Sequence, residues 1–170
     1  MKSTKSKKAF TMTELVFVIV VIGILASVAI PRFGATRDDA DITKTRTLVA
    51  SVRSAVTIER QKRILRGDFS PIFRLTDSNT LDHRIFNAFD GNISFPILEN
   101  APFSCAVNTD KDCWYEKQVG TLVNAQNSDT TDDAQYTYNL PTGGSVDFNL
   151  TKNSFICANL SSSNCRLLTQ

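Results

Sequence analysis

The sequence has little of what enzymes and metal sites are usually built from. Its 170 residues include a single histidine, His83, and four cysteines that form no Cys-x-x-Cys pair, the spacing expected of zinc and redox sites. Asp77 and Asp82 lie near His83, but a solvated histidine at a helix start is a simpler interpretation than a catalytic pairing. With no second histidine and no activated-nucleophile motif, the sequence predicts a protein that is not an enzyme.

A large charge of one sign is also absent. The formal net charge is +2, and four of the 19 basic residues precede Phe10, which leaves 15 basic and 17 acidic residues beyond residue 9. The positive charge therefore belongs to a short leader, residues 1–9. The remainder is slightly acidic and has no general attraction for nucleic acid.

The most prominent feature that is present is an apolar run. Residues 15–30 carry no charge, and Glu14 stands directly before them. The stretch 10–30 is long enough for a transmembrane helix, which needs about 20 residues. Because lysines precede it, the positive-inside rule places the N-terminus in the cytoplasm and the rest of the chain outside. We therefore expect a leader at 1–9, a membrane helix at 10–30 and an exported domain at 31–170.

A cleaved secretory signal is the competing interpretation of the apolar run. Ser27, Val28 and Ala29 have the small-residue character of a signal cleavage site. Two features count against this interpretation. The residues FTMTE place a polar step between the basic and apolar regions, and the helical pattern continues past Ala29.

An amphipathic pattern predicts that the helix continues to Arg66. Apolar residues recur at helical spacing on one face, namely Ile42, Leu48, Val49, Val52, Ala55 and Val56. Arg66-Gly67 is typical of a helix end, and Pro31 and Gly34 are expected to bend the helix. A helix from Phe10 to Arg66 is too long for a small domain to cover, so its first half must be buried in lipid, in other subunits, or in each in turn.

The remaining chain predicts an α+β fold. A short helix is expected at 77–89, with its apolar residues Leu81, Ile85, Phe86 and Phe89 facing inward. Strands at 135–140 and 145–150 flank a turn at 141–144, and another strand follows at 154–157. The expected architecture is one long helix packed on a small antiparallel sheet.

All four cysteines lie in the distal part of the chain, at Cys105, Cys113, Cys157 and Cys165. An even number of cysteines in a small exported domain indicates disulfides and an oxidising compartment. Three pairings are possible. The two local bonds, Cys105–Cys113 and Cys157–Cys165, are favoured because short loops close at the least entropic cost.

The segment KKAFTMTELVFVIVVIGILASVAIP closely resembles the N-terminal signature of type IV pilins and of type II secretion pseudopilins. The shared features are a short basic leader, a small residue followed by Phe, a glutamate early in the mature chain, and a proline that closes the apolar run. Here these are Ala9, Phe10, Glu14 and Pro31. The family usually has glycine where this chain has Ala9, and alanine is the mildest replacement.

The resemblance implies that prepilin peptidase cuts after Ala9 and methylates the new amine of Phe10. The mature subunit then waits in the inner membrane with its domain in the periplasm. An inner-membrane assembly platform draws it into a filament with copies of itself and other pilin-like subunits. The partners implied are therefore this peptidase, these subunits, the platform and, before assembly, membrane lipid. The pilin fold implied, a long bent helix on a small sheet, agrees with the α+β expectation.

Glu14 has a physical reason to be charged in this setting. Cleavage creates a positive amine on Phe10, and a neighbouring subunit staggered by about one helical turn brings that amine beside Glu14. Paired charges in an apolar bundle satisfy each other, whereas unpaired ones are costly, so the pair favours one stagger. The simpler alternative is that Thr11 and Glu14 form a capping box that starts the helix, and the two roles are compatible.

Three weaker candidates remain. Asp129, Asp132 and Asp133 are hard oxygen ligands that suit calcium, but they lack the EF-hand spacing and a polar loop is favoured. Asn92, Asn149 and Asn159 head Asn-x-Ser/Thr sequons, and an aspartate lies two residues before the first two, at Asp90 and Asp147. Five cations around the helix end suggest a phosphate-binding patch, although a solvated helix end is favoured: Arg60, Lys62, Arg63, Arg66 and Arg74.

The function implied is that of a structural subunit, a pilin or pseudopilin, of a type IV pilus or type II secretion-like filament. Secretion, DNA uptake, adhesion and motility remain open within that class. The alternative is an inner-membrane protein with one membrane span whose exported domain binds a ligand or partner and never polymerises. Glu14 separates the two, because only the filament subunit needs its charge.

Overall fold

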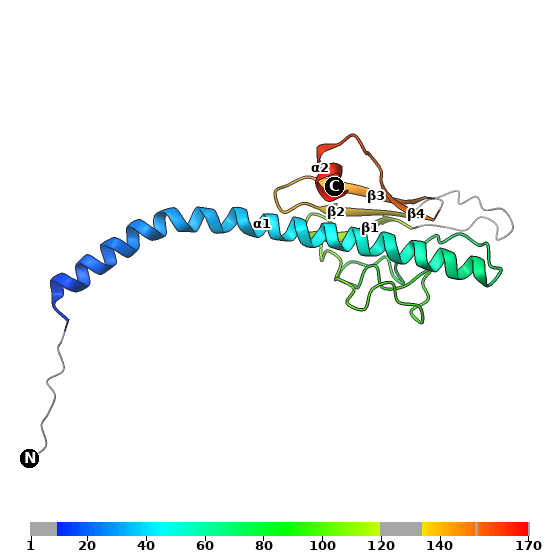
Figure 1. Ribbon diagram of the computed structural model, residues 1–170, viewed down its shortest axis with the longest axis horizontal. Coiled ribbons are helices and arrows are strands. Elements are labelled where there is room, and N and C mark those ends of the chain that lie inside the picture. The colour runs from blue at the N-terminus through cyan, green and yellow to red at the C-terminus, as the bar shows by residue number, and fades with distance from the viewer. Residues whose placement is uncertain (1–9, 120–133, 152, 170) are drawn as a thin grey trace, which may run out of the picture. The chain divides into compact units, whose positions relative to one another are not determined.

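The computed structural model describes residues 10–119, 134–151 and 153–169, with residues 31–35 described by their backbone alone (Figure 1). The chain divides into two compact units, Met1–Asp39 and Ala40–Gln170. The long helix α1, Met12–Leu65, runs through both of them and continues as helix through Pro31 and Gly34. Its bounds agree with the predicted helix to within two residues at each end.

The second unit contains a four-stranded antiparallel sheet. In chain order, the strands are β1, Cys113–Gln118; β2, Ala134–Asn139; β3, Ser145–Thr151; and β4, Ser154–Cys157. They form a simple meander in which neighbouring strands in the sequence pair with each other, and the short helix α2, Ser163–Thr169, follows. The structure confirms the α+β fold and the strands β2, β3 and β4, whereas β1 and α2 were not predicted.

The turn between β2 and β3 depends on two glycines. Gly143 and Gly144 have φ of 103° and 85°, a region that residues with a Cβ rarely adopt. The Leu140 N–H donates to the Gly144 carbonyl at 2.9 Å and closes the turn. This turn fixes the register in which Tyr136 lies opposite Phe148.

The core of the second unit is aromatic. The rings of Phe148 and Phe155 stack with their centroids 5.0 Å apart, and Phe86 meets Trp114 edge-on at 5.2 Å. The second half of α1 closes the core with its predicted apolar stripe, of which Ile42, Val49, Val52 and Val56 are buried and Leu48 and Ala55 partly buried. The periodicity of this half of α1 therefore identified its inward face.

The predicted helix at 77–89 is wrong. This segment is an irregular strap whose backbone pairs with residues 101–105 instead of with itself: the Asp82 N–H donates to the Cys105 carbonyl, and the Ile85 N–H to the Pro102 carbonyl, each at 2.9 Å. Asp82 and Phe86 have φ of 55° and 58°, which no α-helix permits. His83 consequently does not stand at a helix start.

The apolar residues of the strap nevertheless face largely as predicted. Ile85, Phe86 and Phe89 are buried, and Leu81 is exposed. The backbone of this segment therefore differs from the expected helix because it pairs with residues 101–105. Most of the side chains that were expected to face inward are nevertheless buried.

The structure forms the two local disulfides. Cys105 bonds to Cys113 and ties the segment 101–105, with which the strap pairs, to the start of β1, and Cys157 bonds to Cys165 and ties β4 to α2. These are the pairings that loop closure favoured.

Candidate functional site

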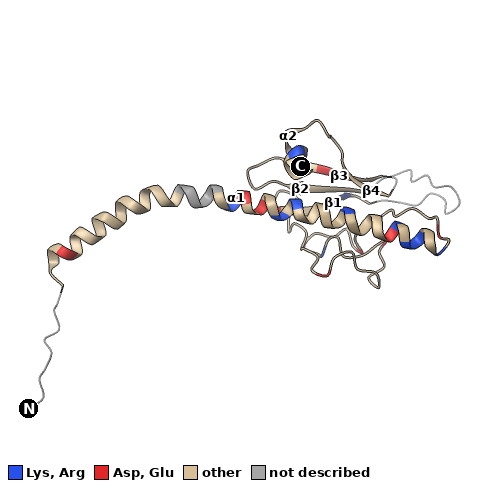
Figure 2. Cartoon of the chain, in the orientation of Figure 1, with Lys and Arg blue, Asp and Glu red and all other residues tan. Residues whose placement is uncertain are grey.

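The first half of α1 is apolar on every side, and its apolar side chains are exposed. The stretch Met12–Ile30 is long and apolar enough to cross a membrane, and none of it is buried. Its apolar side chains, from Leu15 to Ile30, are exposed around the whole circumference of the helix. Figure 2 shows this stretch without charge apart from one acidic residue near its start, which is Glu14.

Glu14 closes a capping box at the beginning of α1. Its N–H donates to Thr11 Oγ1 at 3.3 Å, and the Thr11 N–H donates to Glu14 Oε2 at 3.4 Å. Each residue thereby satisfies an N–H group that the helix start leaves without a partner. Thr11 and Glu14 therefore form the capping box. This does not prevent the charge of the Glu14 carboxylate from having a second role.

Within the described residues, Glu14 has no cation as an ion-pair partner. Phe10 lies just outside the helix and is 78% exposed. Ala9 falls outside the described residues, and Pro31 is described by its helical backbone only. Of the four residues that carry the N-terminal signature, the structure therefore describes the side chains of Phe10 and Glu14, both at the accessible start of the apolar helix.

The basic patch predicted at the end of α1 is largely neutralised. Arg63 lies 3.1 Å from Glu59 and 2.7 Å from Asp90, and it is almost fully buried. Arg74 forms a two-pronged pair with Glu116, and these hydrogen bonds raise the pKa of the Arg74 guanidinium above its usual range. Two further cations of the patch are also held. Arg66 pairs with Glu59, and Arg60 donates to two main-chain carbonyls.

A phosphate-binding patch needs free cations, and these four arginines are instead held by Glu59, Asp90, Glu116 and the main-chain carbonyls at 69–70. The structure thus weakens the case for a phosphate-binding patch, which the sequence suggested only as the less favoured interpretation. The sequence could not reveal this, because Asp90 and Glu116, which pair with Arg63 and Arg74, lie far away along the chain.

His83 and Asp77 form an exposed pair, with His83 Nε2 3.5 Å from Asp77 Oδ1. Burial on its own raises the pKa of Asp77, but the hydrogen bond from Asn87 and the nearby His83 outweigh it, so the pKa of Asp77 lies below its ordinary value. Asp82 is exposed beside them. Asp77 thus helps to shape the strap through Asn87, and the pair includes no nucleophile.

Among the described residues, no group of three or more His, Cys, Asp or Glu is placed to hold a metal ion. The calcium candidates Asp129, Asp132 and Asp133 lie outside the described residues.

The sequon aspartates already have structural partners. Asp90 binds Arg63 and accepts two main-chain N–H groups, and Asp147 accepts from Thr137 and Lys117. Asn92 is exposed, whereas Asn149 lies within β3 and accepts from Gln135. Glycosylation at Asn92 and Asn149 stays a prediction.

Comparisons with known proteins bear on the N-terminal segment. Residues 4–30 match the model of the prokaryotic N-terminal methylation motif. Over 51 residues, the chain is 47% identical to the type IV narrow pilus major component PilA5 of Thermus thermophilus, a match that covers 30% of this chain and 44% of that relative. No solved structure matches the chain. The N-terminal segment thus carries the signature that its residues indicated, and the match spans less than half of the relative.

Proposed function

We propose that this chain, with a pilin-type methylation motif at its N-terminus and an α+β fold beyond it, is a structural subunit of a filament of the type IV pilus or type II secretion class. One observation carries the proposal: the apolar half of α1, which lies within the motif, is exposed on every side. A surface of this kind is not stable in water and has to be covered by something outside the chain.

Two environments cover the same helix in turn. Before assembly, lipid surrounds residues 12–30, whose length suits the hydrocarbon core of a bilayer. After assembly, the equivalent helices of neighbouring subunits surround them. Since both environments are apolar, transfer from one to the other changes little in hydrophobic free energy, and polar contacts decide the geometry of the filament.

Glu14 supplies that polar contact. Cleavage between Ala9 and Phe10 gives Phe10 a charged amine, and the amine of one subunit pairs with Glu14 of the next. The capping bonds leave room for this, because the hydrogen bonds from Thr11 both reach Oε2. Since a carboxylate has two oxygens and accepts several hydrogen bonds, Oε1 is left for the neighbouring amine.

The test separates the charge of Glu14 from its cap. Glu14→Gln keeps a capping side chain and removes the charge, whereas Thr11→Ala removes the cap and keeps the charge. We expect Glu14→Gln to insert into the membrane and to be cleaved normally, but to enter sheared filaments at least about tenfold less efficiently, since an unpaired amine is left in an apolar core. Thr11→Ala should still assemble. Normal assembly of Glu14→Gln would overturn the pairing.

Processing is tested by the intact mass of the protein from its native membrane. A chain that starts at Phe10 and is heavier by one methyl group supports the proposal. A chain that starts at Met1 would remove the amine on which the pairing depends. The chain would then be better described as an anchored protein whose exported domain acts without polymerising.

A further inference from the structure

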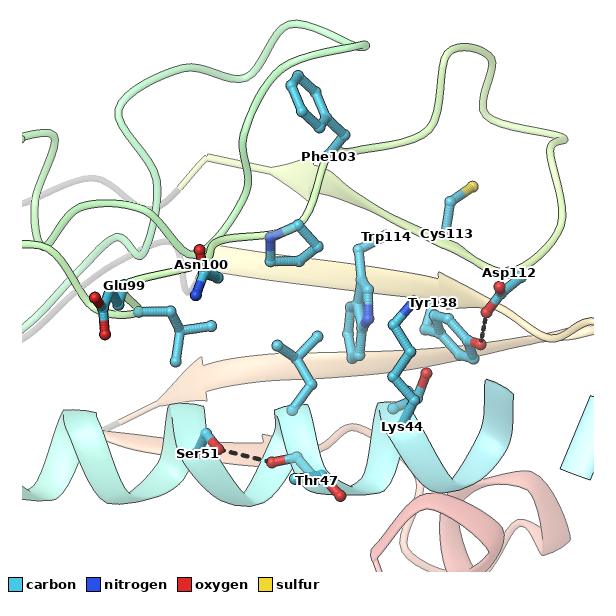
Figure 3. Close-up of a pocket in the computed structure, with 14 residues that line it drawn as sticks. Lys44, Thr47, Ser51, Glu99, Asn100, Phe103, Asp112, Cys113, Trp114 and Tyr138 are labelled. Atoms are coloured by element: carbon cyan, nitrogen blue, oxygen red, sulfur yellow. Dashed lines mark hydrogen bonds between the residues drawn. The ribbon is translucent and has the colours of Figure 1, made fainter. Parts of the chain in front are cut away.

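A pocket lies within the second unit, beside the part of α1 that packs on the sheet. It has a volume of about 470 Å³ and opens between α1, the segment 98–103 and β1 (Figure 3). Apolar side chains form much of its wall: Leu48, Leu98, Pro102, Phe103 and Trp114. Its size and lining are those of a small-molecule site, and it lies apart from the residues through which the proposed assembly runs.

One polar group in this wall has no partner. The indole nitrogen of Trp114 is the single buried side-chain nitrogen or oxygen without a hydrogen bond in the described part of the chain. Trp114 is 3% exposed, and it is held on two sides by the rings of Tyr138 and Phe86, at 5.1 and 5.2 Å. A buried donor without an acceptor is destabilising, and natural folds rarely keep one without a reason. In Figure 3 the indole nitrogen lies on the ring edge turned toward Lys44 and Tyr138, which line the same pocket.

The charges at the rim have both signs. Lys44 has no ion-pair partner among the described residues, and the carboxylates of Glu99 and Asp112 also line the pocket. Asp112 accepts the Tyr138 hydroxyl at 2.5 Å. Because attraction and repulsion at this mixed rim offset each other for a ligand of either charge, the rim selects no net charge, and the apolar wall favours a neutral ligand.

We propose that this pocket binds a small neutral molecule that combines an aromatic or branched apolar body with one amide-type carbonyl, and that the carbonyl accepts the hydrogen bond of the Trp114 indole. The apolar wall takes the body, and the carbonyl satisfies the one donor that the fold leaves unpaired. Because the indole nitrogen is closed to bulk water, a side chain of the wall has to move before the ligand reaches it. Lys44 is the one that we expect to move, because it is exposed and no described carboxylate holds it.

Trp114 is the only tryptophan of the protein, so a single indole ¹⁵N–¹H resonance reports the pocket. The experiment uses the full chain in lipid nanodiscs and benzamide as the probe, which has a ring and an amide carbonyl. We expect a saturable downfield shift of the indole proton. Ethylbenzene has the body without the acceptor and should bind about five- to tenfold more weakly, without a downfield shift. Acetamide has the acceptor without the body and should not bind.

A matched pair of variants tests the location. Ser51 lines the pocket, whereas Ser54 is another exposed serine one helical turn further along α1 and outside this lining. Ser51→Phe should fill the pocket and weaken benzamide binding at least tenfold, and Ser54→Phe should leave binding unchanged. The proposal fails if benzamide leaves the indole resonance unmoved or if the two variants respond alike. It also fails if ethylbenzene binds as well as benzamide, because the indole N–H would then have no part in recognition.

Discussion

Between Met12 and Ile30, α1 exposes apolar side chains on every side, whereas from Ala40 onward it buries one apolar stripe and exposes its polar face. The two halves have the same backbone conformation and different neighbours. The second half is amphipathic and finds its partner within its own chain, in an aromatic core. The first half has apolar residues all round and exposes them, and the proposed assembly rests on this difference.

The glutamates of the two halves differ in the same way. Glu59, in the second half, is buried and lies 3.1 Å from Arg63. Glu14, in the first half, is exposed and has only its capping bonds to Thr11 in the described part of the chain. In the folded unit the sequence supplies a counter-charge for each buried carboxylate. In the exposed half, Glu14 has no counter-charge among the described residues, as the proposed pairing with a neighbouring subunit requires.

The largest effect is expected from placing an aspartate in each half in turn. Val52 is fully buried, and Val20 is 54% exposed. Val52→Asp buries an unpaired carboxylate and should destabilise the second unit by more than about 4 kcal/mol. Val20→Asp should leave that unit unchanged, while it costs about 2.5–3.5 kcal/mol of membrane insertion. Thermal unfolding followed by Trp114 fluorescence measures the first effect, and the membrane-bound fraction measures the second.

The control for this comparison is the Val20→Asp protein in detergent micelles. Its Trp114 unfolding transition should coincide with that of the unmodified chain. A lower transition would mean that the first half of α1 contributes to the folded unit, and the contrast between the halves would then be wrong.

A smaller effect is expected when the two glutamates lose their charge. Glu59→Gln weakens charge-assisted hydrogen bonds to Arg63 and Arg66 in a buried site, and it should cost about 2 kcal/mol of unfolding free energy. Arg63 keeps Asp90 as its partner, so the loss stays below that of a fully unpaired arginine. Glu14→Gln should leave the free energy of unfolding unchanged. Urea unfolding of both full-length variants measures these free energies. Equal losses of unfolding free energy would contradict the distinction between the two glutamates.

The helix start provides a third and more local test. Thr11→Ala removes the Oγ1 that accepts the Glu14 N–H, and loss of an N-cap costs about 1 kcal/mol of local helix stability. We expect faster amide hydrogen exchange in the first turn of α1 and no change in the second unit. Thr57→Ala is a matched control, because its hydroxyl donates to the Arg53 carbonyl inside the helix and caps nothing. Faster exchange at the first turn in both variants would rule out the cap as the cause.

How much of the structure the sequence predicted depends on the range of the interactions that decide each element. The long helix, the disulfides and the β2–β3 turn follow from local patterns: period, short loop length and a Gly-Gly pair. The capping box was also visible, because Thr11 and Glu14 are three residues apart. The N-terminal signature is linear, and it identified the candidate site before any fold was known.

The failures involve partners distant in sequence. β1 has the sequence CWYEKQ, which has no clear alternation, and it becomes a strand because β2 pairs with it, with Trp114 opposite Tyr138. The apolar residues at 77–89 do have helical spacing, but the backbone of the strap donates its hydrogen bonds to residues 101–105 and not to its own preceding turn. Trp114 was not a candidate for any site, because an unpartnered indole becomes visible only once the core is assembled.

The smallest expected effect concerns Asp77, at the point where that predicted helix failed. Asp77 and Asn87 bond to each other twice across the strap, and the pKa of Asp77 lies below its ordinary value. The unfolded chain binds the proton of Asp77 more tightly than the folded chain does. The ionised carboxylate therefore stabilises the fold at any pH above the ordinary aspartate pKa of about 3.9. This stabilisation is lost as the pH falls through the lower pKa of the folded chain.

Asp77→Asn keeps the bond to Asn87 and removes the charge, so it should cost no more than about 1 kcal/mol of unfolding free energy at neutral pH, because the pair with His83 is exposed. The difference between the two proteins should shrink below about pH 4 and vanish at lower pH. Urea unfolding of both chains at a series of pH values measures it. A difference that persists unchanged in acid would mean that Asp77 acts through its shape alone. The negative charge of Asp77 would then contribute nothing to stability, in contrast to the charge that we propose for Glu14 in assembly.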